Sequence, residues 1–198
     1  MNRLTSRSVS AAKTSLCLGT LLLAFEPHAN AGAISLGAWS QFGFTDAGIA
    51  ATGCAPADPA GIFCTPSSGT PTTFLDAPAW TFTAPAGGVF ITLVDAFTTL
   101  EAFELFDGGV SLGVTSAPNQ LGDCGDDPAV CILDPNASRG TFFVAAGARS
   151  LTIVPTLSPD HLGSGFFIAQ SDVPEPSTWA LTGLGLVAFA VRRRKEGV

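Results

Sequence analysis

The sequence predicts an all-β fold, a single antiparallel β-sandwich or jelly-roll-like domain. Glycine, proline, threonine and valine are frequent, whereas runs of helix-forming Lys, Glu and Leu are scarce. Short segments alternate between apolar and polar residues, and turn residues separate them at close spacing. We therefore expect one domain over residues 32–172, flanked by two terminal segments of different composition at 1–31 and 173–198.

Nine segments of this region carry a strand pattern. In 80–83, Trp-Thr-Phe-Thr, one face of the strand is apolar and the other polar, as expected for a half-buried strand. The Asp-Gly-Gly stretch at 107–109 predicts a hairpin turn, and Ala-Gly-Ala-Arg at 146–149 predicts a second one. The expected strands are 34–44, 72–75, 80–83, 89–94, 102–106, 110–114, 141–145, 151–154 and 165–169.

The N-terminal segment has the three parts of a secretory signal peptide. Arg3, Arg7 and Lys13 form a basic region, residues 14–25 form an apolar region, and Ala-Asn-Ala precedes a cleavage site. We expect cleavage after Ala31, with Ala33 as the alternative. The sequence therefore predicts export of the chain.

The C-terminal segment carries a Pro-Glu-Pro motif, an apolar run and a basic cluster, in that order. The apolar run at 179–191 would span only about 20 Å as a helix, against about 30 Å for a hydrocarbon core. We expect it to cross the membrane with help from snorkelling arginines and with its basic end in the cytoplasm; a buried core helix is the alternative. The motif is Val173, Pro174, Glu175, Pro176 and Ser177; the apolar residues include Trp179, Leu181, Leu184, Leu186, Val187, Phe189 and Val191; the cluster is Arg192, Arg193, Arg194 and Lys195.

This three-part tail resembles the PEP-CTERM sorting signal of exported bacterial proteins. The resemblance implies processing near Pro174-Glu175-Pro176 by an exosortase, a membrane-embedded enzyme, so that the membrane anchor is transient. It also implies a bacterium that makes exopolysaccharide or biofilm matrix. The precursor would be anchored with its C-terminus in the cytoplasm, and the mature form would be periplasmic, on the cell surface or extracellular.

The central region carries a second resemblance. Residues 91–97 and 103–109 look like a recurrent globular region found ahead of PEP-CTERM tails, which resembles β-sandwich domains of the CUB or pre-peptidase C-terminal kind. That region is expected to have a Gly-Asp pair where this chain has Leu100-Glu101.

The charge between the two terminal segments is strongly negative. Seven of the 9 Lys and Arg lie in those segments, and only Arg139 and Arg149 remain between them. Counted from 32 to 176, the formal charge is about −12 and lysine is absent. Binding of nucleic acid needs a basic face, so we exclude nucleic acid as a partner. A neutral glycan, a cation or a basic surface fits this charge better.

Four cysteines remain after signal cleavage, and an exported protein meets an oxidising compartment. Each near pair brackets a loop rich in Pro and Asp, so we expect local disulfides, Cys54 with Cys64 and Cys124 with Cys131, each contributing roughly 2.5 kcal/mol. Both spacings exceed those of a zinc site, which is the rival interpretation.

Candidate chemistry is limited to carboxylates. Asp95, Glu101, Glu104 and Asp107 could form a weak calcium site, because Ca²⁺ takes oxygen ligands, or an acid/base pair for glycoside hydrolysis. We rank a solvated acidic face first, calcium second and catalysis third, and expect no other cofactor.

A catalytic triad has little support, because His161 and its neighbours Ser158, Asp160 and Ser164 lie too close in sequence for triad geometry. Trp39 and Trp80 could stack on a sugar, but their alternating strand patterns favour core packing. We therefore predict a non-enzymatic exported protein of the surface or extracellular matrix, with exosortase, the membrane and exopolysaccharide as partners. The alternative is a secreted glycan-binding or glycan-cleaving module.

We predict that the Pro-Glu-Pro motif and the basic cluster have separate roles, the first in processing and the second in anchoring. Glu175→Ala should leave a membrane-anchored but uncleaved protein, because the processing enzyme reads the motif. Deletion of residues 192–195 should instead weaken retention of the precursor, because the basic cluster holds the short helix in place. Mass spectrometry of the C-terminus in the native host is the measurement, and Val198 still attached on most wild-type molecules would contradict transient anchoring.

Overall fold

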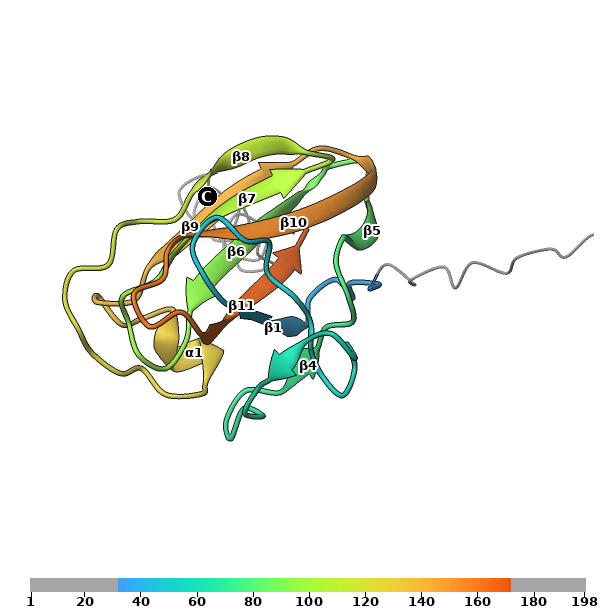
Figure 1. Cartoon of the computed structure of the whole chain (residues 1–198). Helices are drawn as coiled ribbons and strands as arrows, with labels where there is room; N and C mark the ends of the chain where they lie inside the picture. The colour runs from blue at the N-terminus through green and yellow to red at the C-terminus, as the bar shows by residue number, and fades with distance from the viewer. Residues whose placement is uncertain (1–31, 172–198) are drawn as a thin grey trace, which may run out of the picture.

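The computed structural model describes residues 32–171, which form two facing β-sheets (Figure 1). The five-stranded sheet has the order β4 (Thr72–Phe74), β1 (Trp39–Phe44), β11 (Gly163–Gln170), β6 (Val89–Asp95) and β9 (Arg139–Val144). The four-stranded sheet has the order β5 (Trp80–Ala84), β10 (Gly147–Leu157), β7 (Ala102–Asp107) and β8 (Val110–Val114). All neighbours in the two sheets are antiparallel except β1 and β4, and the expected all-β class is confirmed.

Each of the nine segments expected to be strands overlaps a strand of these sheets. The first one was predicted too long, since β1 begins at Trp39 and not at residue 34. Gly37 has a φ of 77°, and this left-handed residue turns the chain away before it joins the sheet. Three short elements were missed: the parallel pair β2 (Cys54–Ala55) and β3 (Ile62–Phe63), and the single-turn helix α1 (Pro128–Cys131).

Of the two predicted hairpins, one is present. β7 and β8 pair antiparallel, and Gly108 and Gly109 between them have φ of 56° and 82°. The second prediction was wrong, because β9 pairs with β6 in one sheet while β10 pairs with β5 and β7 in the other. The turn before Gly147 therefore carries the chain across the core. A short turn with a glycine fits either connection, and only the partners of the two strands distinguish them.

The core between the sheets is rich in aromatic side chains. Phe42 on β1 is fully buried, and its ring contacts three other fully buried rings: Trp80 on β5, Phe103 on β7 and Phe167 on β11. Alternating aliphatic residues of β6, β7 and β10 complete this cluster.

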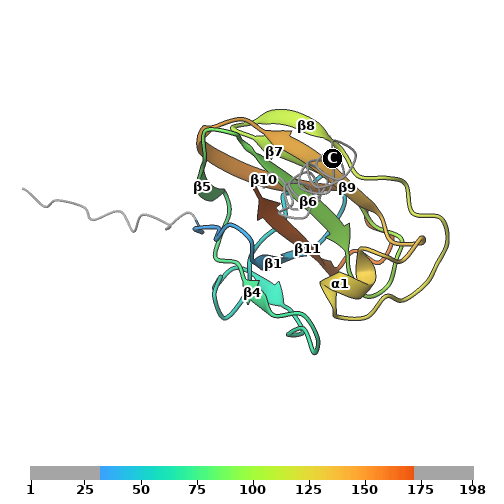
Figure 2. The same cartoon turned by 180° about the vertical axis from the view of Figure 1, so that it is seen from behind.

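A second apolar cluster covers the outer face of the five-stranded sheet. Val94 and Phe166 point away from the main core and pack against Cys124 and Cys131 in the long loop between β8 and β9. Figure 2 shows α1 of this loop lying at the end of β6 and β11. Buried on both faces, β11 is therefore apolar at nearly every position. Within the described range, no helix has the length and apolar character needed to cross a membrane.

Candidate functional site

A cavity of about 220 Å³ lies where three connecting segments meet. One wall is the segment at 62–65, which includes β3. The second is the 96–101 segment that links β6 to β7, and the third is the 160–164 segment that links β10 to β11. Two carboxyl groups face it, from Glu101 and Asp160, and no arginine or lysine of residues 32–171 belongs to its lining.

The wall at 62–65 is held by the Cys54–Cys64 disulfide and by a buried aspartate. Asp58 accepts hydrogen bonds from the backbone N–H groups of Gly53 and Ala60, both at 2.9 Å. Ile62 lies over Gly43 of β1, where a Cβ atom would come within 2.2 Å of it. The absence of a side chain at Gly43 therefore lets this wall lie directly on the sheet.

Asp95, the last residue of β6, shapes the 96–101 wall. Its two carboxyl oxygens accept hydrogen bonds from the backbone N–H groups of Ala96, at 2.9 Å, and of Glu101, at 3.2 Å. Glu101 in turn accepts one from the N–H of Leu100 at 3.0 Å. Both carboxyl groups are nearly inaccessible, with Asp95 0% and Glu101 2% exposed. The pair therefore fixes the conformation of the segment that links the two sheets.

Burial makes the ionised form of Asp95 costly, and the neighbouring charge of Glu101 adds to that cost. Together they raise the pKa of Asp95 to about 9. Burial also raises the pKa of Glu101, with a contribution from the charge of Asp160. Asp95 consequently carries a proton at neutral pH.

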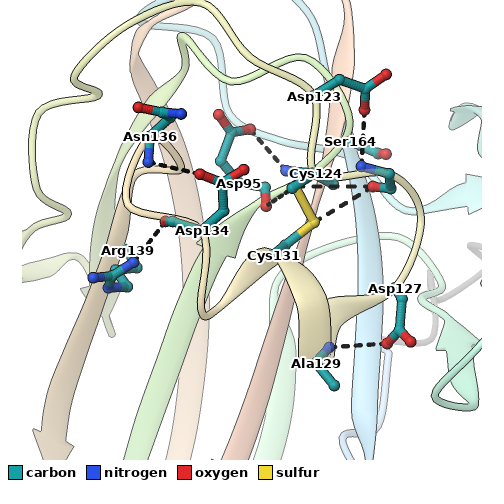
Figure 3. The surroundings of a disulfide bond; sticks show 12 residues. Asp95, Asp123, Cys124, Asp127, Ala129, Cys131, Asp134, Asn136, Arg139 and Ser164 are labelled. Atoms are coloured by element: carbon teal, nitrogen blue, oxygen red, sulfur yellow. Dashed lines mark hydrogen bonds between the residues drawn. A yellow bond between two sulfur atoms is a disulfide. The ribbon is translucent and has the colours of Figure 1, made fainter.

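The 120–125 segment supports the same wall from outside. The N–H of Phe97 donates to the carbonyl of Gly125, and the N–H of Cys124 donates to the carbonyl of Phe97, both at 2.9 Å. Thr99 donates to Gly122 at 3.1 Å. These bonds hold Phe97 in the left-handed region, with a φ of 57°, which costs energy for a residue other than glycine. Figure 3 shows the Cys124–Cys131 disulfide that ties this segment to α1, with Asp95 beside it.

The third wall is held by contacts to the segment after β1. Ser158 donates to the carbonyl of Thr45 at 2.8 Å, and Nδ1 of His161 is hydrogen-bonded to the side chain of Asp46. At the start of β11, Ser164 accepts a hydrogen bond from Nε2 of Gln41 at 3.3 Å. Gln41 is fully buried, and its Oε1 has no hydrogen-bond partner among the described residues.

The four carboxylates considered as a weak calcium candidate are not brought together as one group. They also do not form the solvated acidic face that was ranked first, because Asp95 and Glu101 are buried. Asp95 and Glu101 meet, but Glu104 accepts from Ser111, and Asp107 forms a salt bridge with Arg149 at 3.1 Å. Glu104 and Asp107 both lie on β7, three positions apart. Side chains an odd number of positions apart on a strand point to opposite faces of the sheet, which separates these two carboxylates. Within residues 32–171, no group of three or more His, Cys, Asp or Glu side chains is arranged to hold a metal ion.

The other candidates from the sequence also have structural roles. Ser158 and His161 bond to the segment after β1 and do not form a triad with Asp160. Trp80 is fully buried in the core, and Trp39 packs half-buried in the outer cluster, so neither presents a free ring for stacking. The cysteines pair as expected, Cys54 with Cys64 and Cys124 with Cys131.

The apolar residues that line the cavity were not identified from the sequence. Phe63 and Leu162 line it and are 81% and 58% exposed, and Phe97 lines it from the second wall. These residues lie in three separate connections, so no spacing in the sequence links them. The sequence held one weak signal. Phe63 directly precedes Cys64 in a loop, where a large apolar side chain has little chance of being buried.

Comparison with known proteins gives one match. Residues 172–195 match the PEP-CTERM protein-sorting motif. No curated protein and no solved structure matched the chain. The predicted motif, apolar helix and basic cluster at 173–195 lie outside the described residues, as does the predicted signal peptide at 1–31.

The match identifies a C-terminal sorting signal, which indicates an exported protein. The protein carries a PEP-CTERM motif, as an exosortase substrate does. The motif indicates processing by that membrane enzyme and transient anchoring at the C-terminus.

Removing the Cys124–Cys131 disulfide should loosen the cavity wall selectively. With both cysteines changed to serine, we expect a loss of roughly 2.5 kcal/mol in the free energy of unfolding. Hydrogen exchange at the amides of Phe97 and Thr99 should become faster, because the 120–125 segment that receives them is no longer tied to α1. The matched control is Cys54→Ser with Cys64→Ser, which should leave these two amides protected. Equal protection in both double variants would show that the disulfide does not hold this wall.

The Asp95–Glu101 pair predicts that stability falls as pH rises. The pKa of Asp95 is about 9 in the folded protein and 3.8 as its ordinary value, so the folded protein retains a proton that the unfolded chain releases between these values. The free energy of unfolding contributed by this group therefore decreases from about pH 4 to about pH 9. Glu101→Gln should make the decrease shallower, because it removes the neighbouring charge but leaves the burial.

Urea denaturation at pH 5 and pH 8 measures this difference. Asp76→Asn, which changes one exposed carboxylate elsewhere, is the control and should keep the wild-type pH dependence. An unchanged slope in Glu101→Gln would mean that the two carboxyl groups do not interact.

Proposed function

We propose that the mature domain is a non-enzymatic protein of the cell surface or extracellular matrix, associated with exopolysaccharide. The sorting motif at 172–195 carries this proposal, because it marks a protein that leaves the cytoplasm and is separated from its anchor. Two disulfides support the same view, since they suit an oxidising compartment outside the cytoplasm. We place the mature form in the periplasm, on the surface or outside the cell.

The geometry of the carboxyl groups supports a role without catalysis. Hydrolysis of a glycosidic bond uses two carboxyl groups that flank the bond, both in contact with substrate or water. Asp95 is fully buried, and both of its oxygens accept backbone hydrogen bonds. It is therefore committed to the structure of the 96–101 segment. Glu101 and Asp160 remain at the cavity, but Glu101 is only 2% exposed, so Asp160 is the one carboxyl group of this lining that is open to water.

Glycan binding is the second candidate, and the cavity favours it over glycan cleavage. An exposed phenylalanine, hydroxyl groups and carboxylate acceptors line one concave site. This combination offers an apolar platform and hydrogen-bond acceptors for a sugar. Binding at this site would also give the protein a way to stay in a polysaccharide matrix after its release from the membrane.

A paired measurement tests the proposed function. In cells of the native host, the processed protein should co-fractionate with the extracellular matrix and leave that fraction when the exopolysaccharide is removed. The purified protein should release no new reducing ends from the isolated polysaccharide. Turnover that disappears in Glu101→Gln would identify a glycosidase and overturn the non-enzymatic assignment. A processed protein that stays with the cells whether or not polysaccharide is present would overturn the matrix association.

A further inference from the structure

Among the residues that the structure describes, the cavity lining contains two acidic side chains and no arginine or lysine. Glu101 lies almost completely buried at its surface, and Asp160 lies on the facing segment. The two arginines of the described range are engaged elsewhere, Arg149 with Asp107 and Arg139 with the carbonyl of Asp134. Glu101 accepts a hydrogen bond from the N–H of Leu100, but no cationic side chain of the described residues faces it. A buried carboxylate without a counter-charge is costly, and an incoming cation relieves that cost. The site therefore favours a positively charged ligand.

The size and donor set favour an organic cation over a metal ion. The described residues offer no group of three metal-ligating side chains, whereas Ca²⁺ requires six to eight oxygens. The cavity volume of about 220 Å³ is below that of pockets for drug-sized molecules, which begin at about 300 Å³, and suits one small unit such as a single sugar residue.

The remaining lining suits a sugar ring. Phe63 and Leu162 provide exposed apolar surface at the rim, and Ser164 and Thr98 bring hydroxyl groups. Ser164 is held in place from behind by Nε2 of Gln41, a fully buried residue that is not part of the lining. Together the site offers an apolar platform, hydroxyl groups and carboxylate acceptors in one place.

We infer that the cavity binds an amino sugar whose amino group is free and positively charged, with Glu101 and Asp160 facing the ammonium group and Phe63 contacting the ring. This inference rests on the proposed association with exopolysaccharide and names the chemistry of the polysaccharide. The acidic domain as a whole favours the same choice, because its field attracts cationic chains and repels anionic ones.

Isothermal titration of the purified mature protein with three probes tests the inference. The probes are a glucosamine tetramer, its fully N-acetylated equivalent, and tetralysine. We expect saturable binding of the glucosamine tetramer and at least tenfold weaker binding of the acetylated tetramer, because acetylation removes the ammonium charge. Tetralysine should also bind at least tenfold more weakly, because it has the charge but no sugar ring.

Variants locate the binding. Glu101→Gln, Asp160→Asn and Phe63→Ala should each weaken binding of the glucosamine tetramer about tenfold. Asp76→Asn removes the same charge away from the cavity and should stay within twofold of wild type. Asp160 and Phe63 are exposed, so their variants test the site even where Glu101→Gln alters folding.

Three results would overturn the inference: equal binding of the acetylated tetramer, equal weakening by Asp76→Asn, or no binding of the glucosamine tetramer. None of them depends on where the protein resides. Absence of the protein from the matrix, with selective glucosamine binding intact, would count against the proposed function alone.

Discussion

The packing of the two sheets depends on the contacts of the Phe42 ring. Its ring lies 5.5–6.4 Å from the rings of Phe44, Trp80, Phe103 and Phe167, which come from both sheets. On the neighbouring strand β11, the residue paired with Phe42 is Gly165, where a Cβ atom would come within 2.5 Å of the Phe42 ring. The missing side chain makes room for the large one, and this fit fixes the register of β1 and β11.

A second pair of an aromatic residue and a glycine lies two residues further along β1 and β11. Phe44 pairs with Gly163, where a Cβ atom would come within 2.4 Å of its ring. Gly163 is also the first residue of β11, directly after the segment that forms the third wall of the cavity. The rigid core thereby sets where this segment leaves the sheet. The cavity is a consequence of the aromatic packing at this end of the sandwich.

Each cavity wall has its own tether. One disulfide holds the segment at 62–65, the other holds the segment that supports Phe97, and His161 with Ser158 holds the third. Asp95 adds the bonds that shape the 96–101 wall from beneath. A site built this way is pre-organised, so a ligand would lose little affinity to ordering of the loops. Such a site suits binding that must persist outside the cell, where disulfides remain oxidised.

Local features of the sequence determined much of this protein. Alternation of apolar and polar residues located strands such as β5, because the pleat itself imposes that period, whereas β11 was recognised as a short, mostly apolar run. The near spacing of the cysteines indicated their pairing, since short loops leave few partners within reach. The sorting motif could be recognised from the sequence because it is a linear signal. Its match at residues 172–195 depends on the order of the residues and not on a tertiary structure.

What only the tertiary structure decided are the relations between distant segments. The alternating patterns of β9 and β10 look like those of a hairpin, but their partners in different sheets place the turn across the core. Asp95, Glu101, Glu104 and Asp107 look like one cluster, but strand direction and burial send them to different partners. Phe63, Glu101 and Asp160 are separated along the chain and meet only when the sheets pack. The period of apolar residues in a strand predicts which face of the sheet a side chain lies on. A binding site also depends on which strands and loops pack together, and that period does not specify this.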